Sequence, residues 1–176
     1  MHIDAEPAEL DRFAHALRTL PRVVGASIPS IDGAQLVVEW FGHWPTFHDA
    51  QVVQLVLDRG GVGENAGPTL TLTVYAYLAG PGVEPNGTYV LSKECVVTFG
   101  VRRIAQLELS EFNDQNALWE LAIMDRTRDQ LEWVKFEVVL ASSHGVGGRF
   151  SCHDAVVRSV EPWGWGRNPP VGSRTR

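Results

Sequence analysis

The sequence has two cysteines, little basic charge and no long apolar run. Cys95 and Cys152 lie far apart and form no CxxC pair, so we expect two reduced core residues and no disulfide framework. No apolar stretch approaches the roughly 18 residues of a membrane-spanning helix, so no membrane association is expected. Residues Met1–Glu6 lack the basic and apolar regions of a secretory signal. These absences predict a cytoplasmic protein.

Basic residues are too few for a protein that binds a phosphate backbone. The 176 residues contain 15 Lys plus Arg against 21 Asp plus Glu, a formal net charge of −6. Nucleic-acid binding would favour a basic face, so nucleic acid is not an expected partner. We place one domain in residues 1–162. Residues 163–176 are rich in Pro, Gly and Arg and lack apolar periodicity, so we expect a mobile tail there.

The apolar pattern at the beginning of the chain is helical. Between Asp4, a suitable N-cap, and Pro21 it predicts a first helix. A second helix is expected from about residue 30 to Phe41, with Gly42 as its C-cap, although Leu36–Val38 could instead form a strand.

From Ala50 onward the apolar period changes to two, which is typical of half-buried strands. No later stretch alternates strands with helices, so a parallel doubly wound sheet is not expected. The sequence therefore predicts a single α+β domain, with N-terminal helices followed by a largely antiparallel β-sheet meander of about six to eight strands. The expected strands are 52–58, 69–78, 95–101, 105–109, 117–124, 131–140, 148–153 and 156–160.

Two His-Asp dipeptides, His48-Asp49 and His153-Asp154, are the first candidates for a metal or catalytic site. Both stand at predicted strand starts, where neighbouring side chains point to opposite faces, so one dipeptide cannot easily supply two ligands to one metal. The six histidines form neither an HxH nor an HExxH pattern. We therefore expect no metal, no cofactor and no catalytic residue. A small metal-dependent hydrolase that uses these four residues stays an alternative.

Aromatic residues are concentrated before the first predicted strand. Six tryptophans is a high number for this length, and core packing accounts for most of them. Exposed members could form an interaction surface. They also leave open a second alternative, a carbohydrate- or ligand-binding β module.

The segment Phe41–Val53, FGHWPTFHDAQVV, resembles the Phe-Gly-x-Trp-Pro-Ser-Phe-His-Asp-Ala-Glu-Val signature of the Immunity protein 50 family of bacterial polymorphic-toxin systems. Thr46 replaces Ser, and Gln51 replaces Glu. Further similarities extend the resemblance over roughly residues 40–162, at Leu57–Arg59, Val97–Val101, Glu111–Ala117, Phe150–Cys152 and Val160–Pro162.

The resemblance implies a non-enzymatic immunity protein that captures a cognate toxin in the cytoplasm. An acidic body suits a basic toxin domain, such as a nuclease, because complementary charge accelerates encounter. We expect contacts from Trp40–Asp49 and from the acidic turn Glu111–Asn116. Within the first stretch we predict that His48 and Asp49 mainly fix the turn into the first strand, with toxin contact as the alternative. The second stretch could be an ordinary Asx turn. The predicted contact residues are Trp40, Trp44, Phe47, His48, Asp49, Glu111, Asn113, Asp114 and Asn116.

Overall fold

Antiparallel strands make up most of the computed structural model, which describes residues 27–60, 66–85 and 87–164. In chain order the elements are α2 (Ala34–Phe41), β1 (Gln51–Asp58), β2 (Thr69–Val83), β3 (Tyr89–Ser110), β4 (Ala117–Asp125), the 3-10 turn η1 (Thr127–Asp129), β5 (Phe136–His144) and β6 (Gly147–Pro162).

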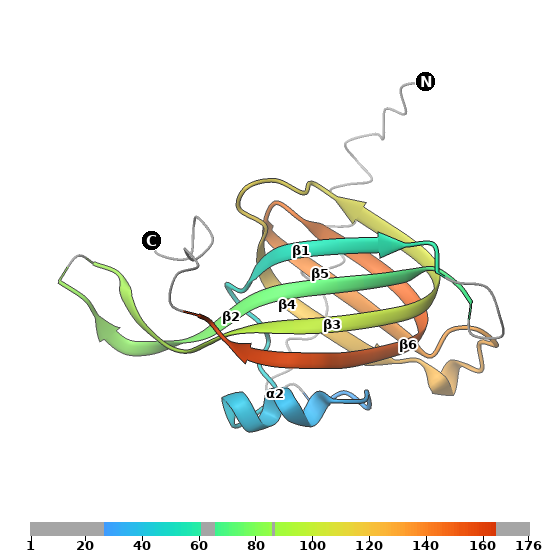
Figure 1. The fold of residues 1–176 in the computed structure, drawn as a ribbon, viewed down its shortest axis with the longest axis horizontal. Helices are drawn as coiled ribbons and strands as arrows, with labels where there is room; N and C mark the ends of the chain where they lie inside the picture. Colours follow the sequence, from blue (N-terminus) through green and yellow to red (C-terminus); the bar gives the residue numbers. More distant parts are fainter. Residues whose placement is uncertain (1–26, 61–65, 86, 165–176) are drawn as a thin grey trace, which may run out of the picture.

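The strands close into a barrel with the order β1-β2-β3-β6-β5-β4 (Figure 1). Strands β1, β2 and β3 pair in the order in which they occur along the chain, and so do strands β4, β5 and β6. The long strands β3 and β6 join the two groups, with a ladder that runs from Cys95 opposite Pro162 to Ser110 opposite Gly147. The barrel closes between β1 and β4, where Gln51 pairs with Ala117.

The predicted α+β class is wrong, because the described residues form a mainly β structure with a single short α-helix. The predicted second helix is present as α2, and Gly42 ends it with a φ of 88° and an N–H that donates to the Val38 carbonyl at 2.7 Å. The predicted first helix lies outside the described residues. The two-residue apolar period from Ala50 onward thus determines the fold class.

Strand β3 covers two segments that the sequence predicts as separate strands, 95–101 and 105–109. Arg103 between them has a φ of 54°, and the register with β6 shifts between Ile104 and Gln106. A bulge of this kind bends a strand and changes which residues face inward without ending the ladder. Strand β6 likewise combines the predicted strands 148–153 and 156–160.

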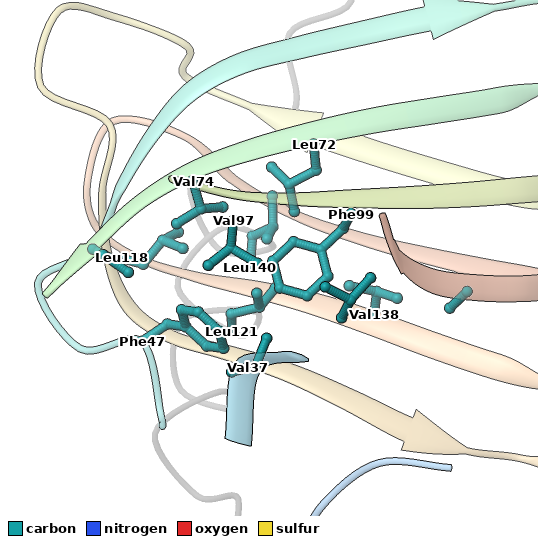
Figure 2. Packing of buried hydrophobic residues seen from close by; sticks show 14 of the residues in the cluster. Val37, Phe47, Leu72, Val74, Val97, Phe99, Leu118, Leu121, Val138 and Leu140 are labelled. Carbon is teal, nitrogen blue, oxygen red and sulfur yellow. The ribbon is translucent and has the colours of Figure 1, made fainter. Parts of the chain in front are cut away.

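The interior is filled by apolar side chains from all six strands and from α2 (Figure 2). Phe47, Phe99 and Leu121 lie among them, and Phe47 contacts Phe99 edge-to-face at 5.7 Å between ring centroids. A six-stranded barrel is narrow enough for side chains to fill it. The interior is therefore a packed core.

Helix α2 lies against β6 beneath the barrel (Figure 1). Its buried residues are Ala34, Val37 and Phe41. Gly33, just before the helix, has a φ of 74°, and a Cβ at this position would lie 2.2 Å from the Val157 carbonyl oxygen. This close approach requires glycine.

Both cysteines are free and buried, one in β3 and one in β6. Burial raises the pKa of the Cys95 thiol to about 12. Burial, with the nearby Asp154 carboxylate, does the same for Cys152. Both thiols therefore stay protonated and poorly reactive in the folded chain.

The boundary of the predicted tail falls just beyond β6. Trp163 donates its backbone N–H to the Glu94 carbonyl at 3.1 Å, and its ring lies 4.7 Å from that of Tyr75. Residues 165–176 lie outside the described residues, so the expected mobility of the tail stays a prediction.

Candidate binding surface

Trp119 on β4 is an exposed aromatic residue that the sequence analysis did not select. Its neighbours Leu118 and Leu121 are buried in the core, whereas 52% of Trp119 is exposed. The register between β4 and β5 shifts between Leu118 and Glu120, so Trp119 sits at a bulge. Bulges often re-aim a side chain beside a functional site. Trp119 thus presents a large apolar surface to solvent.

A tight turn before β1 brings His48 against Trp119. Phe47 and Asp49 have φ values of 60° and 62°, in the left-handed region. The Asp49 N–H donates to the Leu118 carbonyl at 2.9 Å, and the Leu118 N–H donates to the Ala50 carbonyl at 2.8 Å. These bonds fix the turn beside β4, and the His48 ring lies 4.6 Å from the Trp119 ring.

The side chains of His48 and Asp49 approach each other, which corrects the expectation that strand geometry separates them. His48 Nδ1 lies 3.1 Å from Asp49 Oδ2, and both side chains are partly exposed. The reason is that the dipeptide belongs to the turn and not to β1, which begins at Gln51. Left-handed conformations of non-glycine residues cost about 1–2 kcal/mol each and are frequent at functional sites. That these two residues mainly fix the turn, or that they contact a partner, are both still predictions.

The turn 111–116 lies next to the start of β1, because the Val52 N–H donates to the Asn116 carbonyl at 3.0 Å. Asn116 is buried, and its Oδ1 accepts the N–H groups of Asn113 at 2.8 Å and Val146 at 3.1 Å. Asn113 Oδ1 accepts the Gln115 N–H at 2.9 Å. The side chains of the two asparagines therefore hold the turn by accepting hydrogen bonds from backbone N–H groups, as the Asx-turn alternative anticipates.

The same turn presents acidic and aromatic side chains to solvent. Glu111 and Asp114 are exposed, and 58% of Phe112 is exposed. Backbone bonds link this turn to β1, and the His48 turn to β4, so we group these three residues with Trp119, His48 and Asp49 and call the set the Trp119 surface. It combines exposed aromatic rings with three carboxylates near the point where the barrel closes.

Three other predicted contact residues lie elsewhere. Trp44 and Phe47 are buried, and their rings meet edge-to-face at 5.8 Å between centroids. Trp40 is partly buried on α2, and its Nε1 donates to the Lys93 carbonyl at 2.8 Å. Trp44 and Phe47 serve the core in this structure, so their side chains are not exposed anchors.

The second His-Asp dipeptide is held by Arg103. Its Nη2 donates to Asp154 Oδ2 at 2.8 Å and also contacts His153 Nδ1, and His153 Nδ1 lies 3.1 Å from Asp154 Oδ1. Contrary to the sequence expectation, this dipeptide lies within β6 and not at a strand start. Arg103, at its left-handed position in β3, brings the guanidinium to both side chains.

The structure does not bring the two dipeptides together. The first dipeptide lies at the start of β4, because the Asp49 N–H donates to the Leu118 carbonyl. The second dipeptide follows Cys152, which pairs with Phe136 on β5, and Phe136 in turn pairs with Asp125 at the end of β4. Seven residue steps along β4 separate these levels, roughly 23 Å at about 3.3 Å per residue. Among the residues that the structure describes, no group of three or more His, Cys, Asp or Glu side chains could hold a metal ion.

The ion pair of Asp154 makes a pH-dependent contribution to stability. Partial burial acts to raise the pKa of the Asp154 carboxyl, but hydrogen bonds from His153 and Arg103 and their charges outweigh it and hold the pKa below its usual range. A lowered pKa stabilises the fold above the unfolded value of about 3.9, and this stabilisation is lost as pH falls through the folded pKa. We expect Asp154→Asn to lower the free energy of unfolding by about 1–2 kcal/mol at pH 7, and the difference from wild type to shrink as pH falls through the lowered pKa of Asp154. Urea unfolding at several pH values measures it, with exposed Asp114→Asn as the control expected to change little; a difference independent of pH would contradict the assignment.

Comparison with known proteins gives one family. The chain matches the family model described as Immunity protein 50 over residues 33–163. This range contains α2, all six strands and the Trp119 surface. No curated protein and no solved structure matches the chain. No helix in the described part of the chain is long and apolar enough to cross a membrane.

Proposed function

Since the chain belongs to the Immunity protein 50 family, we propose that it neutralises a cognate bacterial toxin by stoichiometric binding in the cytoplasm. The family match over residues 33–163 is the observation that carries this proposal. In this function the protein binds the toxin and transforms no substrate. It therefore needs a binding surface and not a catalytic centre.

The Trp119 surface supports binding of a protein partner. Interfaces concentrate their energy in a few aromatic anchors, with polar residues around them that exclude water. Trp119 supplies an anchor that His48 supports from one side. Asp49, Glu111 and Asp114 supply negative charge near it, which suits a basic toxin domain such as a nuclease.

The other two functions receive less support. A hydrolase would need the two His-Asp dipeptides in one site, but they lie at opposite ends of β4. A ligand-binding module would need its exposed tryptophans close together. Trp119 is near the start of β4, whereas Trp133 lies in the connection that follows the end of β4, beyond η1.

Co-expression tests the proposed function directly. The toxin domain encoded by the gene immediately upstream is expressed in a host with or without this chain, and survival is scored. We expect the toxin to kill the host when it is expressed without this chain, and to be harmless when the two are expressed together. The purified pair should elute as a one-to-one complex on size exclusion. Killing that the chain does not relieve would contradict the proposal.

Charge reversal in the turn 111–116 tests the electrostatic part of the interface. We expect Asp114→Arg to slow association with a basic toxin domain about threefold or more at low salt, and much less at high salt, because screening removes steering. The stability of the fold should not change. Glu132→Arg makes the same charge change on the connection beyond η1 and is the matched control. Equal association rates for wild type and Asp114→Arg at both salt concentrations would remove this turn from the interface.

A further inference from the structure

Strand β1 has one paired edge and one open edge. It pairs with β2 from Gln51 to Asp58, whereas its pairing with β4 is limited to Gln51 opposite Ala117. The last bond on that side is from the Val52 N–H to the Asn116 carbonyl, after which the chain of the turn 111–116 leads away to β3. From Val53 to Asp58, the outer edge has no strand partner in the described ranges. Figure 1 shows β1 as the outermost strand of the front sheet.

Within the part of the chain that the structure describes, this open edge has little protection against pairing with another chain. Natural edge strands are commonly shielded by lysine, proline or a covering element. Between Val53 and Asp58 there is neither lysine nor proline, and Val53, Val56 and Leu57 are exposed. The bulge at Val53 and the charge of Asp58 interrupt only the two ends. About four residues between them offer regular backbone groups and apolar side chains.

The charge around the edge indicates what kind of chain it suits. Asp58 is exposed at one end, and Glu111 and Asp114 are exposed on the turn that meets the other end. Arg59 follows Asp58 and offsets its charge, so a strand that carries basic side chains would find opposite charge mainly at the end beside the turn 111–116. A second copy of this acidic chain would bring like charges together, which disfavours it as the occupant.

We infer that the outer edge of β1, from Val53 to Asp58, accepts an extended basic segment of the toxin as an added strand of the barrel. In this mode of recognition the main-chain hydrogen bonds supply affinity, and alternate side chains supply specificity. The added strand continues from the Trp119 surface, because the chain runs directly from His48 through Val52 into the open edge. The inference rests on the proposed function and specifies how the toxin is held.

Hydrogen exchange of individual backbone amides tests strand addition. The probe is the toxin domain encoded immediately upstream, bound to the full chain. In the free protein, the β1 amides that bond to β2 should exchange slowly and the alternate, outward amides quickly. In the complex the outward amides should slow at least tenfold.

Three outcomes would overturn the inference, and they are distinguishable. Outward amides that are already slow in the free protein would show that the chain covers its own edge. Outward amides that stay fast in the complex, while amides near Trp119 become slow, would place the toxin elsewhere and leave the proposed function intact. Absence of any complex on size exclusion would remove the proposed function together with this inference.

A matched pair of variants gives a second measurement. Val56→Lys places a positive charge, the same sign as that of the proposed basic segment, in the middle of the edge. It should weaken binding of the toxin domain at least tenfold. Thr73→Lys on β2, one strand further from the edge, should change it less than twofold. Circular dichroism confirms that both variants fold. Equal affinities would contradict strand addition, and a free wild-type dimer that Val56→Lys converts to a monomer would identify a second copy as the occupant.

Discussion

Replacing Trp119 with alanine should weaken toxin binding by about 30-fold or more. Anchoring aromatic residues at the centre of an interface contribute about 2 kcal/mol or more on truncation, and each 1.4 kcal/mol is tenfold in affinity. Trp119 is half exposed in the free protein, so a partner that buries the exposed apolar part of its ring gains binding free energy. Stability should change little, because the side chain lies outside the core.

Trp133→Ala is the control for this experiment. Trp133 is 63% exposed, similar to Trp119, but lies in the connection beyond η1, away from the turn 111–116. Its replacement should alter affinity less than twofold. Isothermal titration of the toxin domain with both variants measures the difference. Similar losses for the two variants, or no loss for Trp119→Ala, would exclude the Trp119 surface as the centre of the interface.

Phe47→Ala should destabilise the fold by about 3–5 kcal/mol. Phe47 is buried and contacts Trp44 and Phe99 edge-to-face, so its removal leaves a cavity between the turn and β3. The expected cost is the lost transfer energy together with that cavity. Denaturant unfolding measures it directly. Protection against the toxin should fall only as far as the folded fraction falls.

The matched variant is Phe112→Ala, in which an exposed phenylalanine of the turn 111–116 is removed. Its free energy of unfolding should stay within about 0.5 kcal/mol of wild type in the same denaturant experiment. If Phe47→Ala kept full stability but lost toxin binding, Phe47 would be a contact residue, as the sequence analysis proposes.

The local patterns predict most strands of this fold, but not how they combine. The alternation around Leu70 to Leu78 lies in β2, and the α2 region ends at Gly42 as expected. The pattern at 131–140 is misleading, because β5 begins only at Phe136 and the exposed Leu131 and Trp133 belong to the preceding connection. A short apolar alternation carries no information about which residues find a partner strand.

Bulges and turns account for the other differences. The left-handed conformation at Arg103 joins two predicted strands into β3, and no glycine or proline marks it in the sequence. The turn at Phe47 and Asp49 follows Pro45 and is considered in the sequence analysis, but its left-handed conformations, which direct His48 towards Trp119, leave no mark in the residue pattern. The sequence analysis selected His48 and Asp114 but missed Trp119, because its exposure depends on the β4 bulge. The resemblance of residues 41–53 indicated the correct family independently of the fold class.

The pairing of β3 with β6 also constrains when the chain can fold during synthesis. Cys95 pairs with Pro162, so the ladder that joins the two groups of strands is complete only when nearly the whole described chain has left the ribosome. Folding through such distant contacts is slow, because loop closure must precede the stabilising contacts. Under the proposed function, the chain can bind its toxin only after β6 has been translated. The proposed function would then require folded protein to be present before the toxin arrives, because a chain that is still being translated lacks this ladder.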